Sequence, residues 1–599
     1  MKFSKLTACG AFALFFAFLV SCEEKEAKTA EAKTSGYPRS ETLYLAGSQW
    51  GEPNTFNPLV EPWLVAWPAN DRFNLMYEPL TAYNSLTGST EPILGTLVSY
   101  DAEKVVVDIQ PEAKWSDGMP VTSKDVKFIY ELGKRFPQAP TSYVGEFVSE
   151  IKVDTINDGV ERMSFIVNKK ERDNPLAILD QLQAIRIVPS HVFEKYLEEN
   201  NGDFSAVKKI KCDERPIVSG PYTLAQYNNE RIVLIRRDDY WGNKVLHDGA
   251  LPVPKYIIHP IFKNNDAFAI NLQKGDLDAS MNYIPRVNEK KKDAVNTWYD
   301  APPYFVPGSM HFLFLNNTKA PLSDKKFRRA MAAAIDYDAI SRLALSNYAP
   351  KMKPGLVMSE GLEKKFYSEE EVNKHSVPLG DKEYAKKLLA EAGYKAGFDD
   401  KGNLKYSLGP KGDTLPTLLI KAPAGWSDWE AIVNLVVKHL RSVGIDVREG
   451  FVDGSQYWPA LPSGEFDIIM RKPPVAVTAS LPWNRFNSVM SARNWVAVGE
   501  GSMNENEGRY KSKRADELLD KIPLLLENEE ALKAAYIELN NIFLDDQPVI
   551  PVCHLPEEYY QFSEKRWTGW PTEKNPFAPP QLPWVGSGIN TLWRLKQVK

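Results

Sequence analysis

Hydrophobic and polar positions alternate along the chain with two periods, one typical of strands and the other of amphipathic helices. Residues 104–109, KVVVDI, form a predicted strand. The pattern after them predicts a helix whose N-cap is Thr122 or Ser123, since a hydroxyl there accepts a hydrogen bond from the first turn. Ser323 and Asp428 are the predicted N-caps of two further helices. Short strands that alternate with helices predict an α/β protein.

One unit occurs twice, in which a glycine ends a helix and the chain enters a short strand. Gly275 stands in the sequence QKGDLD, and Gly464 stands in PSGEFD. A glycine suits this position because it readily adopts the left-handed conformation that closes a helix. Two such units predict two α/β lobes of related build. Ligands of open α/β sheets bind at the loops that leave the strands, so the expected site is a cleft between the lobes.

The first residues of the chain are predicted to be a targeting signal rather than part of the fold. Lys2 and Lys5 precede an apolar run over residues 11–20, which is too short for a membrane-spanning helix. The run ends in Leu-Val-Ser-Cys, which resembles the lipobox of bacterial lipoproteins. The resemblance implies a signal peptide of residues 1–21 and diacylglycerol on the sulfur of Cys22. The protein would then be exported and lipid-anchored to the cell membrane, facing the periplasm or the cell exterior.

The segment after the signal is predicted to be a tether. Residues 22–40 are charged and poor in large apolar side chains, so they cannot bury enough surface to fold.

The whole chain has 43% hydrophobic and 25% charged residues, which is typical of globular proteins. Its formal net charge of -5 argues against nucleic acid as a partner. Cys212 and Cys553 remain after processing, and the sequence leaves open whether they pair.

Sequence patterns of enzymes are missing from the chain, which predicts a binding protein without catalytic residues, cofactor or bound metal. The seven histidines are not spaced as metal ligands on one helix face. Neither a phosphate-binding P-loop nor a G-x-S-x-G nucleophile turn occurs. A secreted glycoside hydrolase stays open as an alternative, because its two carboxylates are defined by their separation in space rather than by a motif.

Five stretches in order resemble the family 5 extracellular solute-binding proteins, the dipeptide-, oligopeptide- and oligosaccharide-binding receptors of ABC importers. The stretches are YEPL at 77–80, WSDGMPVTSKDV at 115–126, SGPY at 219–222 with DYWG at 239–242, LNN at 315–317 with FRRA at 327–330 and AID at 334–336, and AKKLLAEAGY at 385–394. Each stretch is weak alone, but the five together, behind a lipobox, are similar to that family throughout. Trp115, Tyr240 and Trp241 within them are predicted to be core aromatics.

The resemblance implies the two-lobed type II fold of periplasmic binding proteins, in its large cluster C form with an extra subdomain inserted in lobe I. The predicted parts are lobe I over 41–80, 215–304 and 555–599, the inserted subdomain over 81–214, and lobe II over 305–554. The resemblance also implies hinge closure of the lobes around a ligand. A monomer and the permease subunits of an ABC importer as partners are expected on the same ground.

Peptide-binding members of the family carry an aspartate after a lobe II strand that pairs with the peptide's α-amino group, and this chain departs from that pattern. No aspartate occurs between Asp467 and Asp516. A buried ammonium group without an anion would be costly. Glu500, Glu505 or Glu507 could substitute for the aspartate, which keeps a peptide or dipeptide ligand open.

The 15 tryptophans favour an oligosaccharide ligand, of the β-linked gluco- or manno-oligosaccharide type that the Trp-rich branch of the family binds. Flat indole faces pack on the C–H faces of sugar rings, while Asn and Arg side chains bind the hydroxyls. The tryptophans chosen as candidates fall in or beside predicted loops. The candidate ligand-binding residues are Trp50, Trp67, Asn282, Tyr283, Trp426, Trp429, Trp458, Trp483, Asn484 and Arg493.

Overall fold

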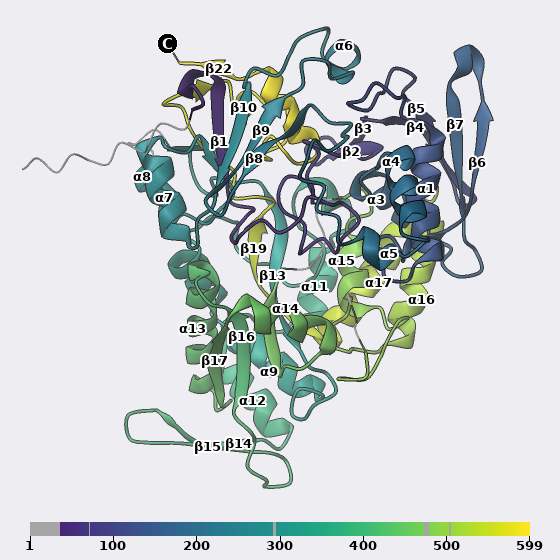
Figure 1. Cartoon of the computed structure of the whole chain (residues 1–599). Coiled ribbons are helices and arrows are strands. Elements are labelled where there is room, and N and C mark those ends of the chain that lie inside the picture. Colours follow the sequence, from purple (N-terminus) through teal and green to yellow (C-terminus); the bar gives the residue numbers. More distant parts are fainter. Residues whose placement is uncertain are drawn as a thin grey trace, which may run out of the picture.

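The computed structural model describes residues 36–598 except 71, 291–294, 473–477, 502 and 504 (Figure 1). The predicted signal peptide, the lipidation site at Cys22 and most of the tether lie outside the described residues. Among the helices that the structure describes, none is both long and apolar enough to cross a membrane.

Lobe I is built on a seven-stranded mixed sheet. In spatial order its strands are β12 (Val295–Thr297), β20 (Gln561–Ser563), β11 (Ala279–Ser280), β1 (Thr42–Ala46), β10 (Tyr256–Pro260), β9 (Arg231–Arg236) and β8 (Tyr222–Tyr227). Strand β1 runs parallel to both of its neighbours, and the other pairings are antiparallel. Helix α7 (Asn265–Lys274) comes between β10 and β11 in the chain, as expected for a crossover between strands that share a parallel partner.

Lobe II is built on a five-stranded sheet with helices around it. The strands in order are β17 (Val447–Val452), β16 (Leu418–Pro423), β18 (Ile468–Arg471), β13 (Pro307–Leu315) and β19 (Val549–Pro556). The helices are α9 (Lys325–Ala334), α10 (Tyr337–Ala339), α11 (Glu369–His375), α12 (Lys382–Glu391), α13 (Ser427–Ser442), α14 (Gly454–Ser463), α15 (Trp483–Met490), α16 (Lys513–Lys521) and α17 (Glu529–Asp546). A hairpin of β14 (Lys395–Phe398) and β15 (Leu404–Leu408) projects from the lower end of this lobe (Figure 1).

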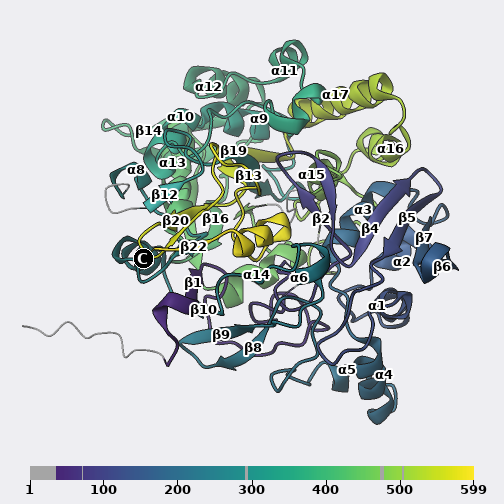
Figure 2. The same cartoon turned by 90° about the horizontal axis from the view of Figure 1, so that it is seen from above.

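The inserted subdomain has its own four-stranded antiparallel sheet. The strands in order are β4 (Gly95–Tyr100), β5 (Lys104–Ile109), β7 (Glu161–Val167) and β6 (Val148–Thr155). Its helices are α1 (Ser123–Arg135), α2 (Val144–Phe147), α3 (Pro175–Ala184), α4 (Ser190–Glu199) and α5 (Phe204–Val207), and a hairpin of β2 (Thr81–Asn84) and β3 (Ser89–Pro92) precedes the sheet. Figures 1 and 2 both show the subdomain at the side of lobe I, with α3 close to α15 of lobe II.

The chain passes between the two large sheets twice. It leaves lobe I after β12 and enters lobe II with β13, and it returns from β19 to β20. The C-terminal segment then closes on lobe I through β21 (Trp567–Thr568), a 3-10 helix (Gly586–Trp593) and β22 (Lys596–Gln597). Two short connections between otherwise separate sheets are the arrangement in which lobes move as rigid bodies about a hinge.

Several local predictions are confirmed. The predicted strand over 104–109 is β5, and Thr122 is the N-cap of α1, where it forms a capping box with Asp125. Gly275 and Gly464 end α7 and α14 in the left-handed conformation, with φ of 81° and 74°. The aromatic residues predicted for the core are buried, as seen for Trp115, Tyr240 and Trp241.

Two predicted helix caps are wrong by one or two positions. Helix α9 is capped by Asp324, whose side chain accepts from the backbone N–H of Lys326, and not by Ser323. The residue at the N-cap of α13 is Trp426, while Asp428 lies inside the first turn and is buried. The backbone torsions at a boundary decide which polar residue caps a helix, and a run of several capping residues hides that choice in the sequence. Cys212 and Cys553 are both free thiols.

Candidate functional site

A series of aromatic rings runs from lobe I into lobe II. Trp50, which follows β1, packs edge-on against Phe268 of α7 with ring centroids 5.0 Å apart. On its other side Trp50 faces Trp426 of lobe II at 6.2 Å, with the two ring planes tilted by 33°. Trp426 in turn contacts Trp429 at 4.8 Å and Trp458 at 6.4 Å. Four of the predicted residues, Trp50, Trp426, Trp429 and Trp458, therefore come together where the lobes meet.

The rings of this series differ in exposure, which separates packing from accessible surface. Trp429 is buried and lies against His311 of β13 with centroids 4.9 Å apart. Trp50 and Trp426 are half-buried. Trp458, in α14, is 51% exposed, and its ring leans on Tyr457, whose hydroxyl donates to the carbonyl of Met470 at 2.7 Å. The hydrogen bond of Tyr457 thus fixes the ring against which Trp458, at the exposed end of the series, packs.

A buried histidine, His259, holds the loop that carries Trp50. His259 Nε2 accepts hydrogen bonds from the backbone N–H groups of Ser48 and Gln49 at 3.1 and 3.2 Å, and its Nδ1 lies 2.8 Å from the carbonyl of Pro260. Burial lowers the pKa of His259 to about 3, so the ring is neutral and can accept these bonds. Trp50 Nε1 donates to the carbonyl of Gly47 at 3.2 Å, which fixes the indole on this loop.

The first turn of α13 presents polar groups to lobe I beside the tryptophans. Ser427 Oγ accepts from Asn265 Nδ2 at 3.3 Å, a contact that joins α13 to α7. The carboxylate of Asp428 accepts from the hydroxyl of Tyr559, at 3.5 Å, on the second crossing between the lobes. Burial raises the pKa of Asp428 to about 6. Aromatic faces and hydrogen-bonding groups therefore share one junction, the combination that small-molecule sites use for orientation.

Trp67 is buried in lobe I away from the aromatic series, and its predicted contact with a ligand stays a prediction. Its side chain is 1% exposed and packs between His259, at 4.8 Å, and Trp584, at 5.2 Å. The ring therefore supports the histidine that holds the Trp50 loop. A loop position suggested exposure, but the loop folds back over the lobe I sheet and buries the ring.

Asn282 and Tyr283 are placed near the junction but make structural contacts. The side-chain oxygen of Asn282 accepts from Ser280 Oγ at 2.8 Å. A Cβ on Gly47, whose φ is 121°, would lie 2.5 Å from the same oxygen, so the two loops approach as closely as only a glycine permits. Tyr283 donates its hydroxyl proton to the carbonyl of Ala344 in lobe II at 2.6 Å, and so links the two lobes directly.

Trp483, Asn484 and Arg493 face the inserted subdomain or the interior of lobe II rather than the aromatic junction, and their contact with a ligand stays a prediction. Trp483 is the first residue of α15, is 4% exposed, and donates from Nε1 to the carbonyl of Leu519 at 2.8 Å. Asn484 donates to Asp180 of α3 at 3.1 Å. Arg493 donates to the carbonyl of Glu171 at 3.0 Å. A helix begins where the sequence predicts a loop, and it turns Asn484 toward the subdomain.

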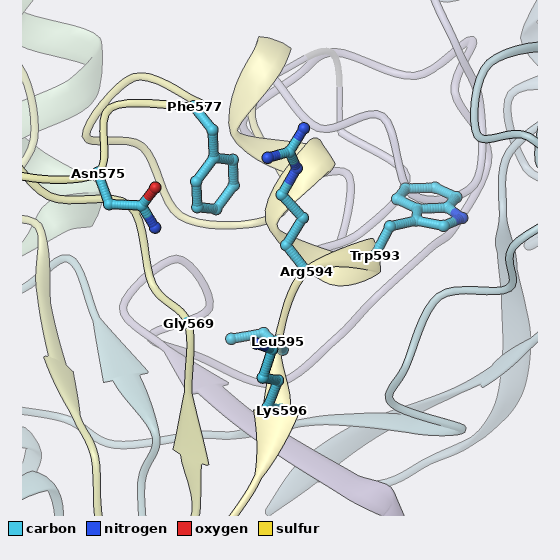
Figure 3. Close-up of a pocket in the computed structure, with 7 residues that line it drawn as sticks. All are labelled: Gly569, Asn575, Phe577, Trp593, Arg594, Leu595 and Lys596. Carbon is cyan, nitrogen blue, oxygen red and sulfur yellow. The ribbon is translucent and has the colours of Figure 1, made fainter.

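Two cavities lie outside the aromatic junction. One, of about 430 Å³, is formed by the C-terminal segment, where Arg594 lies over the ring of Phe577 at 4.7 Å (Figure 3). None of the predicted ligand-binding residues lines it. The second, of about 270 Å³, lies between the subdomain and lobe II, and Trp483 and Arg493 are among its lining residues.

The glutamates considered as substitutes for the missing aspartate are placed differently from one another. Glu507 is fully buried and paired with Arg471 of β18. Glu505 is half-buried, and burial raises the pKa of its carboxyl group while the charge of Arg172 lowers it. Glu500 is exposed. Glu505 and Glu507 are thus engaged within the protein, which leaves Asp428 as the buried carboxylate beside the aromatic series.

Sequence reasoning missed Phe268, Tyr457, His259 and Asp180. Tyr457 stands next to Trp458 in the sequence, so its support of that ring could have been inferred. Phe268 lies on the buried stripe of a predicted helix and carries no signal of a site. His259 and Asp180 act through partners about 210 and 300 residues away in the chain, and no local pattern reveals such partners.

Comparison with known proteins agrees with this architecture. Residues 89–486 match the family model described as bacterial extracellular solute-binding proteins, family 5 Middle. The chain belongs to this family. Family 5 proteins bind solutes for transport, and the two-lobed type II fold predicted from the sequence is that of the family's solved structures.

Individual relatives of this family 5 protein differ in what they are described as binding. A mannohexaose-bound periplasmic oligopeptide-binding protein of an oligopeptide ABC transporter, from Thermotoga maritima, is 30% identical with a TM-score of 0.81, covering 94% of this chain and 99% of that one. The probable peptide-binding protein YejA of Agrobacterium fabrum is 25% identical, covering 93% of this chain and 89% of its own. The periplasmic oligopeptide-binding protein OppA of Escherichia coli is 24% identical over 80% of each chain.

Proposed function

We propose that this family 5 protein captures an oligosaccharide between its two lobes and delivers it to the permease of an ABC importer. The observation that carries the proposal is the aromatic series that joins Trp50 of lobe I to Trp426 and Trp458 of lobe II. Indole faces contributed by both lobes suit a ligand that offers a flat C–H face on each side, as a pyranose ring does. When the lobes separate, the facing surfaces of Trp50 and Trp426 become free for such a ring.

The polar groups at the same junction support a sugar. Asp428 can accept hydrogen bonds from hydroxyls, and the first turn of α13 adds Ser427. The relative from Thermotoga maritima, which has a mannohexaose bound, shares the fold over 94% of this chain. We therefore propose a manno- or gluco-oligosaccharide as the ligand, with Trp50, Trp426 and Trp458 as its contact residues.

A peptide is the second candidate, because YejA is described as a probable peptide-binding protein and OppA as an oligopeptide-binding one. An α-ammonium group needs an anion when it is buried. Asp428 would be that anion in this chain, since Glu507 is paired with Arg471. A peptide ligand would therefore use the same junction but would depend on the charge of Asp428.

A binding panel decides between the two. Purified protein is heated with manno-, cello- and xylo-oligosaccharides and with di- to hexapeptides, and hits are titrated by calorimetry. A ligand at about 100 times its Kd stabilises the protein by about 2.7 kcal/mol, which a melting curve resolves. Stabilisation by mannohexaose or cellohexaose and by no peptide supports the proposal. Stabilisation by peptides alone overturns the sugar assignment and restores the second candidate.

The same samples test the hydrolase alternative. A transport protein returns its ligand chemically unchanged, so chromatography after overnight incubation should show only the oligosaccharide that was added. Shorter products would contradict the transport role if the activity that forms them copurifies with the protein through a second column. The proposal also includes the lipid anchor at Cys22, a monomeric state and the predicted limits of the lobes.

A further inference from the structure

The carboxylate of Asp180 joins the inserted subdomain to lobe II. Asp180, in α3, accepts three hydrogen bonds, and all three donors belong to lobe II. Ser480 donates through its backbone N–H at 3.2 Å and through its Oγ, and Asn484 donates through Nδ2 at 3.1 Å. Asp180 and Ser480 are 300 residues apart in the chain, so these bonds form only when the subdomain and lobe II meet.

A second polar contact lies in the same interface. Arg493 donates from Nη1 to the backbone carbonyl of Glu171 at 3.0 Å, and its Nη2 pairs with Asp520 of α16. Glu171 precedes α3 by a few residues, so both contacts engage one short stretch of the subdomain. On the lobe II side, they engage residues at the start of α15 and just after its end. The interface is therefore a small polar contact between two elements.

Some buried polar atoms in the interface between these two contacts have no hydrogen-bond partner. A cavity of about 270 Å³ lies there, lined by residues 169–174 of the subdomain and by residues of α15 and α16. Among the atoms that the structure describes, Arg172 Nε, Asn174 Nδ2 and Asn487 Oδ1 are buried without a hydrogen-bond partner. A buried polar group without a hydrogen-bond partner destabilises the contact that buries it. The hydrogen bonds of Asp180 thus offset the unfavourable free energy of these unpartnered groups, as expected of a contact that opens and closes.

We propose that Asp180 is a positioning residue for ligand capture: it holds the inserted subdomain against lobe II and so stabilises the closed arrangement of the protein. A ligand that binds the closed arrangement has an apparent affinity set by how much of the free protein is already closed. Asp180 makes its contribution at a distance from the aromatic series. The inference therefore goes beyond the proposed function and holds for a sugar and a peptide alike.

The test replaces Asp180→Asn, which keeps the size of the side chain. An amide has one accepting oxygen, and its NH2 group faces the donors of Ser480 and Asn484, so the contact weakens. The ligand-free variant should show a larger radius of gyration in small-angle scattering. Its Kd for mannohexaose should rise about threefold to thirtyfold, mainly through faster dissociation. Glu194→Gln is the matched control, since Glu194 pairs with Lys124 inside the subdomain.

A double-mutant cycle with Ser480→Ala separates this role from a general loss of fold. If Asp180 acts through Ser480, the combined variant changes the scattering less than the sum of the two single variants. Additive effects, or a wild-type radius of gyration in Asp180→Asn, would overturn the inference. The scattering needs no ligand. If mannohexaose fails to bind the wild type, only the sugar assignment fails, and the cycle still decides the role of Asp180.

Discussion

Trp50 and Trp426 face each other across the two lobes, with ring centroids 6.2 Å apart and planes tilted by 33°. Trp50 is fixed by a loop that His259 supports, and Trp426 is fixed at the N-cap of α13. The two rings belong to different lobes, so hinge motion changes the distance between them directly. This pair links the fold to the proposed capture of a flat ligand.

The exposed end of the aromatic series gives the cleanest test of ligand stacking. Trp458→Ala should lower affinity for the bound oligosaccharide by about 5- to 150-fold, taking roughly 1–3 kcal/mol for one stacked ring by analogy with base stacking. The melting temperature should change little, because the side chain is 51% exposed. Trp63→Ala is the control, since Trp63 is 73% exposed and lies in a separate turn. Calorimetry that shows equal affinity for both variants and the wild type would remove Trp458 from the site.

Trp483 should behave as a core residue. Its ring is 4% exposed, and its Nε1 donates to Leu519, so Trp483→Ala leaves both a cavity and an unpaired carbonyl. The free energy of unfolding should fall by about 3–5 kcal/mol. Ligand binding should be lost only in proportion to unfolding. Denaturant titration and calorimetry on the same sample check this, and a stable variant with weakened binding would return Trp483 to the ligand site.

Stability should depend on pH through Glu557, which lies on the second crossing between the lobes. Its carboxylate accepts from Ser85 at 2.6 Å and from Gln581 at 2.5 Å. Burial raises its pKa to about 7, with Glu558 raising it further and Lys472 lowering it. The protonated carboxyl group stabilises the folded protein. This stabilisation is complete below about pH 4.5, the ordinary pKa of a glutamate, and is lost as the pH rises through 7.

Glu557→Gln keeps a neutral group at that position at every pH. The variant should exceed the wild type in stability at pH 8 by on the order of 1–3 kcal/mol, and the difference should vanish near pH 4.5. Chemical denaturation at pH 8, 6.5 and 5 measures this dependence. Glu150→Gln, at an exposed carboxylate, serves as the reference. A difference between Glu557→Gln and wild type that stays constant across the three pH values would contradict the assignment.

Membrane attachment should depend on one sulfur atom. Cys22→Ser removes the thiol to which a diacylglycerol group would be joined, so the protein should appear in the soluble fraction after cell lysis. Detergent phase partitioning measures the change. Cys212→Ser is the matched control and should partition as the wild type does. A Cys22→Ser protein that still enters the detergent phase would rule out the lipid anchor.

Local features were predictable because their causes are local. Gly275 and Gly464 end helices since each takes a left-handed conformation that a side chain would strain, and this follows from residue type alone. The capping box of Thr122 and Asp125 lies within four residues. Burial of Trp115 follows from a hydrophobic position beside a turn. The sequence by itself also determined the α/β class and the resemblance to family 5.

Tertiary structure alone decided which aromatic rings meet. Trp458 and Trp483 both lie on helices, yet one is half exposed and the other is buried, because Trp458 stands beside Trp426 at the aromatic junction while α15 packs on α16. Trp67 lies in a predicted loop, yet its ring packs against Trp584, more than 500 residues later in the chain. Asp180 finds its donors 300 residues away. Exposure and long-range partners depend on how whole elements pack, and no local period in the sequence encodes that packing.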